Sequence, residues 1–357
     1  MKKTSKILGI IALAAVIGFS SCGDGGSGII PDYSWYDSSG TYFEISTVEQ
    51  LLGFANLVNG HDGKDKTNFN GKTVTLTDDI NLNNKKWIPI VEPTGDSAGR
   101  FFYGEFDGGG KTISGLYVSS IHSNQGLFGR NHGTIRNLGV SGTVKSEGYN
   151  IGGIVGANYG TVEECWFEGS VSGDSSVGGV VGDNNSFGSE IGTIKNCYNT
   201  GTVSARVGDA GGITGSSRGL ISYCYNTGNV TAGFGSGVAA GIAVSFSPEI
   251  KNCVSLGLKV TTVSEFDQVG RITTSTSSNL ENNKARSDMK IGERNSEVAV
   301  DGTHNSKDGE SVALGIGQAT VFSGWDGLIW NISGNLNVGD NLPTLKNVAP
   351  LTQPKLP

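Results

Sequence analysis

The sequence predicts an all-β protein, a right-handed parallel β-helix (solenoid) with a cap at each end and one short α-helix in the N-terminal cap. Three observations lead to this fold class. Glycine accounts for 57 of the 357 residues, and only 17% of residues are charged, where an ordinary globular protein has about 25%. Short β-type runs alternate with glycine, asparagine and serine, without a helical period. Residues 125–285 divide into similar units of roughly thirty residues.

Residues 1–21 have the organisation of a lipoprotein signal peptide. Lysines precede an apolar stretch over 7–19, which is shorter than the roughly 20 residues that span a bilayer. The Phe19-Ser20-Ser21-Cys22 sequence resembles a bacterial lipobox, although Phe19 stands where leucine is usual. The resemblance implies cleavage before Cys22 and acylation of its thiol and amine. An ordinary secretory signal is the alternative.

Residues 22–40 would then comprise the lipidated cysteine and a flexible, glycine-rich tether. We expect an exported protein that a lipid anchors to the outer membrane or cell surface, without a prediction of the leaflet. Cleavage removes three lysines and no acidic residue, so the net charge moves from −7 to −10. Since no basic footprint remains, we expect no nucleic-acid partner.

Residues 41–124 are expected to form the N-terminal cap and the initial coil. A capping box at 46–49 precedes apolar residues at helical spacing, and Asn59-Gly60 ends this helix. Strand-like runs follow at 73–76, 87–90 and 101–106. The segment resembles the initial coil of right-handed β-helix proteins with a pectin-lyase-like fold, in which a cap shields the apolar end of the solenoid.

Six units align when the apolar residue after a glycine pair is used as the anchor. The third unit carries an insertion at 186–191, which we place in a turn. One unit cannot bury its apolar residues alone, whereas stacking in register buries them in continuous columns. The units begin at Gln125, Gly152, Gly178, Gly211, Ala240 and Gly270.

Two sets of small or polar residues are expected at the bends of the coils. Glycine pairs suit turns because glycine adopts positive φ and allows close backbone approach without a steric penalty. The predicted turn glycines are Gly152, Gly153, Gly178, Gly179, Gly211 and Gly212. A candidate asparagine ladder at a second bend consists of Asn137, Asn196, Asn252 and Asn282.

Four cysteines occupy one equivalent position in successive units: Cys165, Cys197, Cys224 and Cys253. The first unit has Leu138 there, so the position faces the interior, and we interpret it as a ladder of free thiols. Disulfides remain an alternative, because stacked Cα atoms about 4.8 Å apart fall within range although parallel Cβ vectors fit the bond poorly. We predict no metal site, because a linear ladder does not converge on one point. No cofactor is expected.

The units resemble the GLUG motif, a repeat of bacterial surface proteins. The resemblance is carried by GGIVG at Gly152, TIKNCYNTGTV at Thr193 and LISYCYNTGNV at Leu220. Some immunoglobulin A peptidases contain this motif outside their catalytic machinery. The resemblance therefore implies a β-helix and an adhesin-like surface function.

Residues 286–348 lose the repeat and supply large apolar groups for a C-terminal cap. The pattern around Trp325 and Trp330 resembles the closing segment of other GLUG-containing proteins. Both rings are expected to seal the end of the solenoid, and the alternative is that they stack on a carbohydrate ligand. Residues 349–357 are proline-rich, so we predict a disordered tail.

No catalytic residue is predicted. His61, His122, His132 and His304 lie in separate polar segments, and the sequence has no HExxH, no P-loop and no GxSxG between a strand and a helix as in a nucleophile elbow. A polysaccharide lyase or glycoside hydrolase on a β-helix would need carboxylates on one face. The candidate carboxylates do not gather at one aligned position: Asp78, Asp79, Asp107, Glu163 and Glu164.

We therefore predict a non-catalytic cell-surface lipoprotein, an adhesin or a module that binds glycan or protein. A glycan-cleaving enzyme and a purely structural surface protein are the alternatives. The expected partners are the membrane, through the lipid, and a host or matrix glycan or protein, and we expect a monomer.

Overall fold

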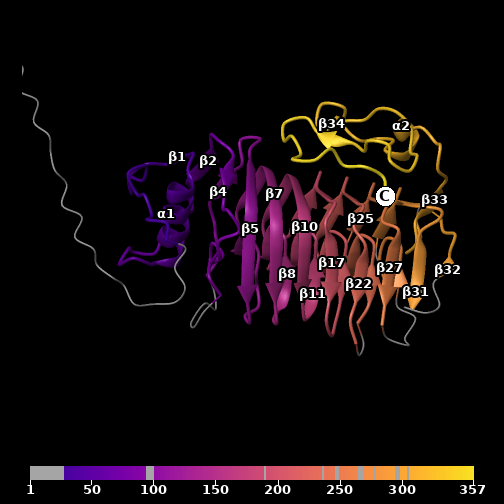
Figure 1. Ribbon diagram of the computed structural model, residues 1–357, viewed down its shortest axis with the longest axis horizontal. Coiled ribbons are helices and arrows are strands. Elements are labelled where there is room, and N and C mark those ends of the chain that lie inside the picture. The colour runs from indigo at the N-terminus through magenta and orange to yellow at the C-terminus, as the bar shows by residue number, and fades with distance from the viewer. Residues whose placement is uncertain are drawn as a thin grey trace, which may run out of the picture.

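The structure is a computed structural model that describes residues 28–93, 100–188, 190–234, 237–245, 249–263, 269–275, 279–293, 298–303 and 305–357. These residues form a parallel β-helix, as predicted. Figure 1 shows its coils stacked from α1 (Val48–Asn59) at one end to β33 (Glu310–Val312) near the other. Cys22 and His304 lie outside the described residues. Within those residues, no helix is long and apolar enough to cross a membrane.

Strands of successive coils pair in parallel and form columns along the axis. The first column contains β1 (Tyr42–Ile45), β2 (Thr73–Leu76), β4 (Glu105–Asp107), β7 (Thr134–Ser146), β10 (Thr161–Gly173), β15 (Thr193–Lys195), β20 (Leu220–Ser222), β25 (Glu249–Lys251) and β29 (Asn279–Glu281). The long strands β7 and β10 continue into the second and third columns.

The second column adds β3 (Ile80–Asn81), β5 (Thr112–Ser120), β16 (Tyr198–Asn199), β21 (Tyr225–Asn226), β26 (Val254–Ser255), β30 (Lys284–Arg286) and β33. The third adds β17 (Thr202–Ala205), β22 (Val230–Ala232), β27 (Lys259–Thr262), β31 (Lys290–Glu293) and the antiparallel β32 (Val298–Ala299).

Two five-stranded parallel sheets complete the coils. One contains β8 (Tyr149–Gly152), β11 (Ser175–Gly178), β18 (Ala210–Gly211), β23 (Ala239–Ala240) and β28 (Val269–Gly270). The other contains β6 (Phe128–Asn131), β9 (Val155–Asn158), β12 (Val181–Asn184), β19 (Thr214–Ser217) and β24 (Ala243–Ser245).

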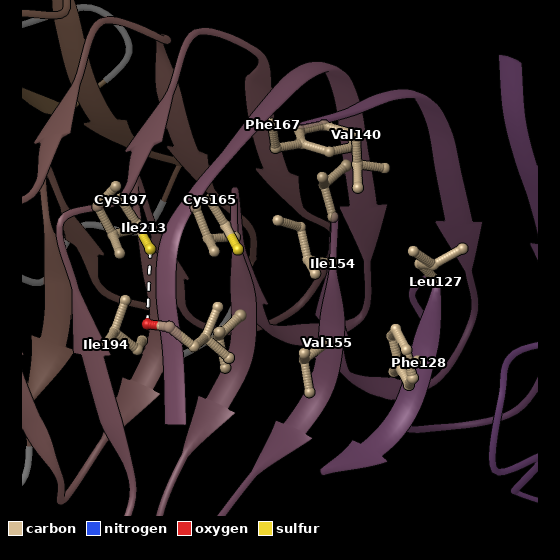
Figure 2. Packing of buried hydrophobic residues seen from close by; sticks show 14 of the residues in the cluster. Leu127, Phe128, Val140, Ile154, Val155, Cys165, Phe167, Ile194, Cys197 and Ile213 are labelled. Carbon is tan, nitrogen blue, oxygen red and sulfur yellow. Dashed lines mark hydrogen bonds between the residues drawn. The ribbon is translucent and has the colours of Figure 1, made fainter. Parts of the chain in front are cut away.

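The register stacks the apolar anchors of the six units in the core. The anchors are fully buried in every unit: Leu127, Ile154, Val180, Ile213, Ile242 and Ile272. The residues that follow them are in register, since Phe128 pairs with Val155 and Val155 pairs with Val181. Figure 2 shows part of this packing. A slip of one residue would turn these side chains to solvent, so the apolar pattern specifies the register.

The bend before the thiol position is left-handed in all six units, with φ between 51° and 55°. Asparagine tolerates this conformation better than other residues with a Cβ. This bend contains Asn137, Glu164, Asn196, Tyr223, Asn252 and Asn282. The four asparagines are therefore bend residues, and no hydrogen bond among them is observed: Asn137 Nδ2 donates to Asp107 Oδ1 at 3.1 Å, and Asn196 Oδ1 accepts from Trp330 Nε1 at 3.3 Å.

Hydrogen-bonded asparagine ladders occur elsewhere in the interior. Asn131 Nδ2 donates to Asn158 Oδ1, and Asn158 Nδ2 donates to Asn184 Oδ1, both at 2.8 Å. Asn199 Nδ2 donates to Asn226 Oδ1 at 2.8 Å in a second ladder. These contacts satisfy buried amides that would otherwise destabilise the fold.

The prediction of positive φ at the glycine pairs is wrong. Gly152, Gly178 and Gly211 end strands, and none of the six turn glycines has a left-handed φ. The second glycine of each pair is instead required by close packing. A Cβ at Gly179 would lie 2.3 Å from Asn199 Cγ, and a Cβ at Gly212 would lie 2.3 Å from Asn226 Nδ2.

Helix α1 covers the N-terminal end of the solenoid. Its N-cap is Thr47, one residue later than the predicted box: Gln50 N donates to Thr47 Oγ1 at 3.3 Å, and Gln50 Oε1 accepts from Ser46 N at 2.8 Å. Gly60 ends the helix with φ 72°. The Phe54 ring stacks on that of Phe106 at a centroid distance of 5.6 Å. The helix thereby removes an apolar edge from water.

Only the first part of the predicted C-terminal cap at 286–348 closes the end of the solenoid, and the segment after it, which contains Trp325 and Trp330, does not. Residues 313–357, called here the C-terminal strap, lie along one flank of the coils (Figure 1). The last coil is closed instead by a loop whose Lys307 carbonyl accepts from Ile272 N and Thr273 N, both at 3.0 Å. The strap contains α2 (Gln318–Val321) and the hairpin of β34 (Trp330–Asn331) and β35 (Thr344–Leu345).

The strap covers a column of outward-facing side chains, which explains its lateral position. Trp166, Tyr198, Tyr225 and Val254 pair in register, and the Tyr198 and Tyr225 rings stack at 4.8 Å. Tyr225 OH donates to Pro343 O at 2.7 Å. Large rings on the outside of the coils would otherwise form an exposed apolar patch.

The tail at 349–357 is ordered, so the prediction of disorder is wrong. Asn341 and Lys355 form an antiparallel bridge, and Leu356 is buried. Arg286 Nη1 donates to Pro357 O at 2.8 Å. Proline has no backbone N–H to donate, but its carbonyl group can accept, as those of Pro354 and Pro357 do here. The insertion at 186–191 also has more structure than a turn, since β13 (Ser186–Phe187) and β14 (Glu190–Ile191) form an antiparallel hairpin.

Candidate functional site

The four cysteines form a buried column of free thiols. Each is fully buried, and none is in a disulfide. Figure 2 shows Cys165 and Cys197 in adjacent coils. Their sulfur atoms lie 3.1 and 3.2 Å from the carbonyl oxygens of Glu163 and Lys195. Burial raises the pKa of Cys165 and Cys224 well above the ordinary value, which makes these thiols poor nucleophiles.

Trp325 and Trp330 are buried, with 8% and 1% of their surface exposed. Trp325 Nε1 donates to Asn252 O at 3.0 Å, and Trp330 Nε1 donates to Asn196 Oδ1 at 3.3 Å. Because both rings face the coils under the strap, the structure contradicts the alternative that they contact a ligand.

The candidate carboxylates have separate structural partners. Arg136 Nη2 lies 2.7 Å from both Glu105 Oε1 and Asp107 Oδ2, and Asp107, Arg136 and Glu163 are neighbours in register. Asp79 Oδ1 accepts from Thr112 N at 2.8 Å.

The remaining two candidates differ in burial. Asp78 is exposed. Burial is the largest cause that raises the pKa of Glu164, followed by repulsion from Glu163. Contacts within the coils therefore account for Asp79 and Asp107, but not for Asp78.

Four rings form a surface feature that the sequence reading missed: Phe101, Tyr103, His132 and Tyr159, called here the aromatic strip. Phe102 bridges to Asn131, and Asn131 pairs with Asn158, so the residues that follow them stand in one column. The His132 ring stacks on Tyr103 at 4.8 Å and on Tyr159 at 6.3 Å.

Phe101 packs edge-on against the strip. Its ring centroid lies 5.3 Å from that of His132 and 5.2 Å from that of Tyr159. Tyr103 remains 36% exposed. A histidine or tyrosine directly after the inward asparagines Asn131 and Asn158 was the available signal, but the rings are far apart in sequence.

A cleft of about 400 Å³ adjoins the strip and shares Phe101 and Tyr103 with it. Asn59 holds its walls together, since Asn59 Nδ2 donates to Pro89 O at 3.0 Å and Asn59 Oδ1 accepts from Glu92 N at 2.8 Å. Tyr103 N donates to Asn68 O at 2.9 Å. The cleft is lined by Val58, Asn59, Lys66, Thr67, Asn68, Val91, Glu92, Arg100, Phe101 and Tyr103.

Charged groups surround the other end of the strip. His132 Nδ1 lies 2.9 Å from Oε2 of Glu190, on the inserted hairpin. Asp183 is 8% exposed, and burial raises the pKa of its carboxyl group. One Asp183 oxygen accepts from Asn185 Nδ2 at 3.1 Å, while Oδ1 has no hydrogen-bond partner. Partly exposed rings beside polar and charged groups provide both apolar contact and orientation for a ligand.

Two other histidines, His61 and His122, lie apart from the strip. His61 Nε2 is 2.9 Å from Glu92 Oε2 at the cleft, and His122 N donates to Ser120 Oγ at 3.0 Å. In the part of the chain that the structure describes, no cluster of three or more His, Cys, Asp or Glu side chains could hold a metal ion.

Comparison with known proteins identifies the fold. No protein-family model matches the chain, and no curated protein matches it. The chain is similar to the crystal structure of a Bacteroides ovatus protein described provisionally as an immunoglobulin A1 protease, with a TM-score of 0.70 and 22% sequence identity. The match covers 88% of this chain and 94% of that chain. At this identity, the likeness shows a shared β-helix and carries no activity across.

Proposed function

We propose that the protein is a non-catalytic surface lipoprotein that binds glycans through the aromatic strip and its adjoining cleft. The observation that carries the proposal is the strip, in which Tyr103, His132 and Tyr159 stack across successive coils beside a polar cleft. Sugar rings have apolar faces and polar edges, so they fit exposed rings flanked by hydrogen-bonding groups. The rigid solenoid holds these rings in position at little entropic cost.

Export and anchoring are part of the same proposal. The lipobox-like sequence before Cys22 and the glycine-rich segment after it support a lipid-held protein with a tether. The GLUG-like repeats support an adhesin-like surface location, through family analogy. Radiolabelled palmitate incorporation that persists in a Cys22→Ser variant would contradict the anchor.

Binding can be tested with the purified protein on a glycan array. We expect Tyr103→Ala to weaken binding of each glycan that the wild-type protein binds by about tenfold, or about 1.4 kcal/mol, because the substitution removes an apolar ring face from the contact. Tyr117→Ala is the matched control, since Tyr117 is 38% exposed against 36% for Tyr103 and lies outside the strip. Equal effects of the two substitutions would contradict a ligand contact at the strip.

The absence of catalysis needs its own assay. The protein is incubated with a panel of plant, bacterial and host polysaccharides, and new reducing ends or unsaturated products are measured. We expect none. Any product that accumulates in proportion to protein concentration would favour a glycan-cleaving enzyme instead.

A further inference from the structure

We propose that the sugar unit held in the cleft carries an anionic group, a carboxylate or a sulfate. This inference rests on the proposed glycan binding and adds the chemical class of the ligand. It depends on the charges of the groups that line the cleft.

Two cations line the cleft, Lys66 and Arg100. Neither forms an ion pair with any side chain in the described ranges. Other cations of this acidic protein do have carboxylate partners, for example Arg136 with Glu105 and Asp107, and Lys251 with Glu249 and Glu281. Two cations that have no ion-pair partner among the described residues attract an anion to the cleft, and the low-dielectric walls strengthen the attraction.

The one acidic group that lines the cleft can offset only one of these two charges. Glu92 is the carboxylate among the lining residues, and its Oε2 lies 2.9 Å from His61 Nε2. The backbone N of Glu92 is bound by Asn59 Oδ1, so this residue is held against the wall. A ligand anion therefore meets Lys66 and Arg100.

Most neutral polar groups of the cleft already form hydrogen bonds within its walls. Both polar atoms of the Asn59 amide have partners. Thr67 Oγ1 accepts from Phe69 N at 3.3 Å, and Asn68 Oδ1 accepts from Asn70 N at 3.1 Å. The cations and the half-exposed Tyr103 ring are the groups that remain to orient a ligand. A guanidinium group binds carboxylate and sulfate through paired hydrogen bonds, which gives orientation as well as affinity.

The experiment compares matched ligands by isothermal titration calorimetry. One pair is oligogalacturonate and its methyl ester, which differ in the carboxylate charge. The other is chondroitin sulfate oligosaccharide and its desulfated form. We expect at least one charged member to bind about tenfold or more tightly than its matched counterpart, as charge-assisted hydrogen bonds predict, and to bind more weakly at high salt. The pair that responds identifies the anion.

A double variant, Lys66→Gln with Arg100→Gln, tests the residues directly. It should lose most of the preference for the charged ligand while circular dichroism stays unchanged. Lys145→Gln removes an exposed charge elsewhere on the surface and should preserve the preference. Neutral glycans that bind as tightly as charged ones, with no effect of the double variant, would overturn the anionic ligand and leave the proposed function standing. A protein that binds no glycan on the array would overturn both.

Discussion

Replacement of Gly179 by alanine should destabilise the protein strongly although the backbone at this position is not left-handed. The added Cβ would lie 2.3 Å from Asn199 Cγ, 2.4 Å from Asn199 Nδ2 and 2.4 Å from Gly212 O. Ordinary van der Waals contact requires more than an ångström of additional separation. Either the Asn199 side chain or the spacing between two coils must therefore change.

Asn199 cannot move without a loss of hydrogen bonds. Its Nδ2 donates to Gly201 O and Asn226 Oδ1, both at 2.8 Å, and its Oδ1 accepts from Gly201 N at 2.9 Å. Overpacking costs about 1–3 kcal/mol, and each buried polar group left without a partner costs about 1–3 kcal/mol more. We expect a loss of at least about 3 kcal/mol in the free energy of unfolding.

Urea denaturation followed by far-ultraviolet circular dichroism measures this loss. Gly327→Ala is the matched control, because a Cβ at Gly327 has no heavy atom within 4 Å and its φ is not left-handed; it should change stability by less than about 0.5 kcal/mol. The Gly179→Ala/Asn199→Ala double variant should show a coupling of about 1 kcal/mol or more. A Gly179→Ala variant as stable as the control would refute close packing as the reason for the glycine column.

Three further predictions concern other parts of the molecule. The four ladder thiols should resist iodoacetamide in the native protein and react after denaturation, because all four are fully buried; rapid native labelling of all four, read by mass spectrometry, would contradict the buried ladder. Asp183→Asn should stabilise the protein at pH 7 and have little effect well below the ordinary pKa of aspartate. Burial raises the pKa of Asp183 in the folded protein, so its carboxyl group destabilises the fold only as pH rises above the pKa of the unfolded chain. Thermal melts across pH measure the effect, and a stabilisation by Asp183→Asn that grows as pH falls would contradict the reasoning. Trp330→Ala should cost about 3–5 kcal/mol because the ring is 1% exposed between strap and coils, and limited proteolysis should then remove the strap first; a strap that stays protected in this variant would show that other contacts hold it.

The coils of this protein follow from its sequence because each unit repeats the same local pattern. Leu138 in the first unit and the cysteines in the next four occupy one equivalent position. A position that accepts leucine faces the interior, and the structure places it there. The positive-φ bend was assigned to the wrong residues because glycine serves two purposes, left-handed backbone and close packing. In this fold the bend before the thiol column is formed mainly by asparagine, while the second glycine of each pair makes room for a side chain of the facing strand.

The strap and the aromatic strip were decided by tertiary structure. Trp166, Tyr198 and Tyr225 follow the thiol position in their units, and nothing in one unit says that a distant segment covers them. Tyr103, His132 and Tyr159 are single residues in three separate segments, and the stacking of coils makes them neighbours. Local periodicity therefore determined which residues enter the core and in what register. The contacts among outward side chains depend on which coils and segments meet in space, and that information is distributed over the whole chain.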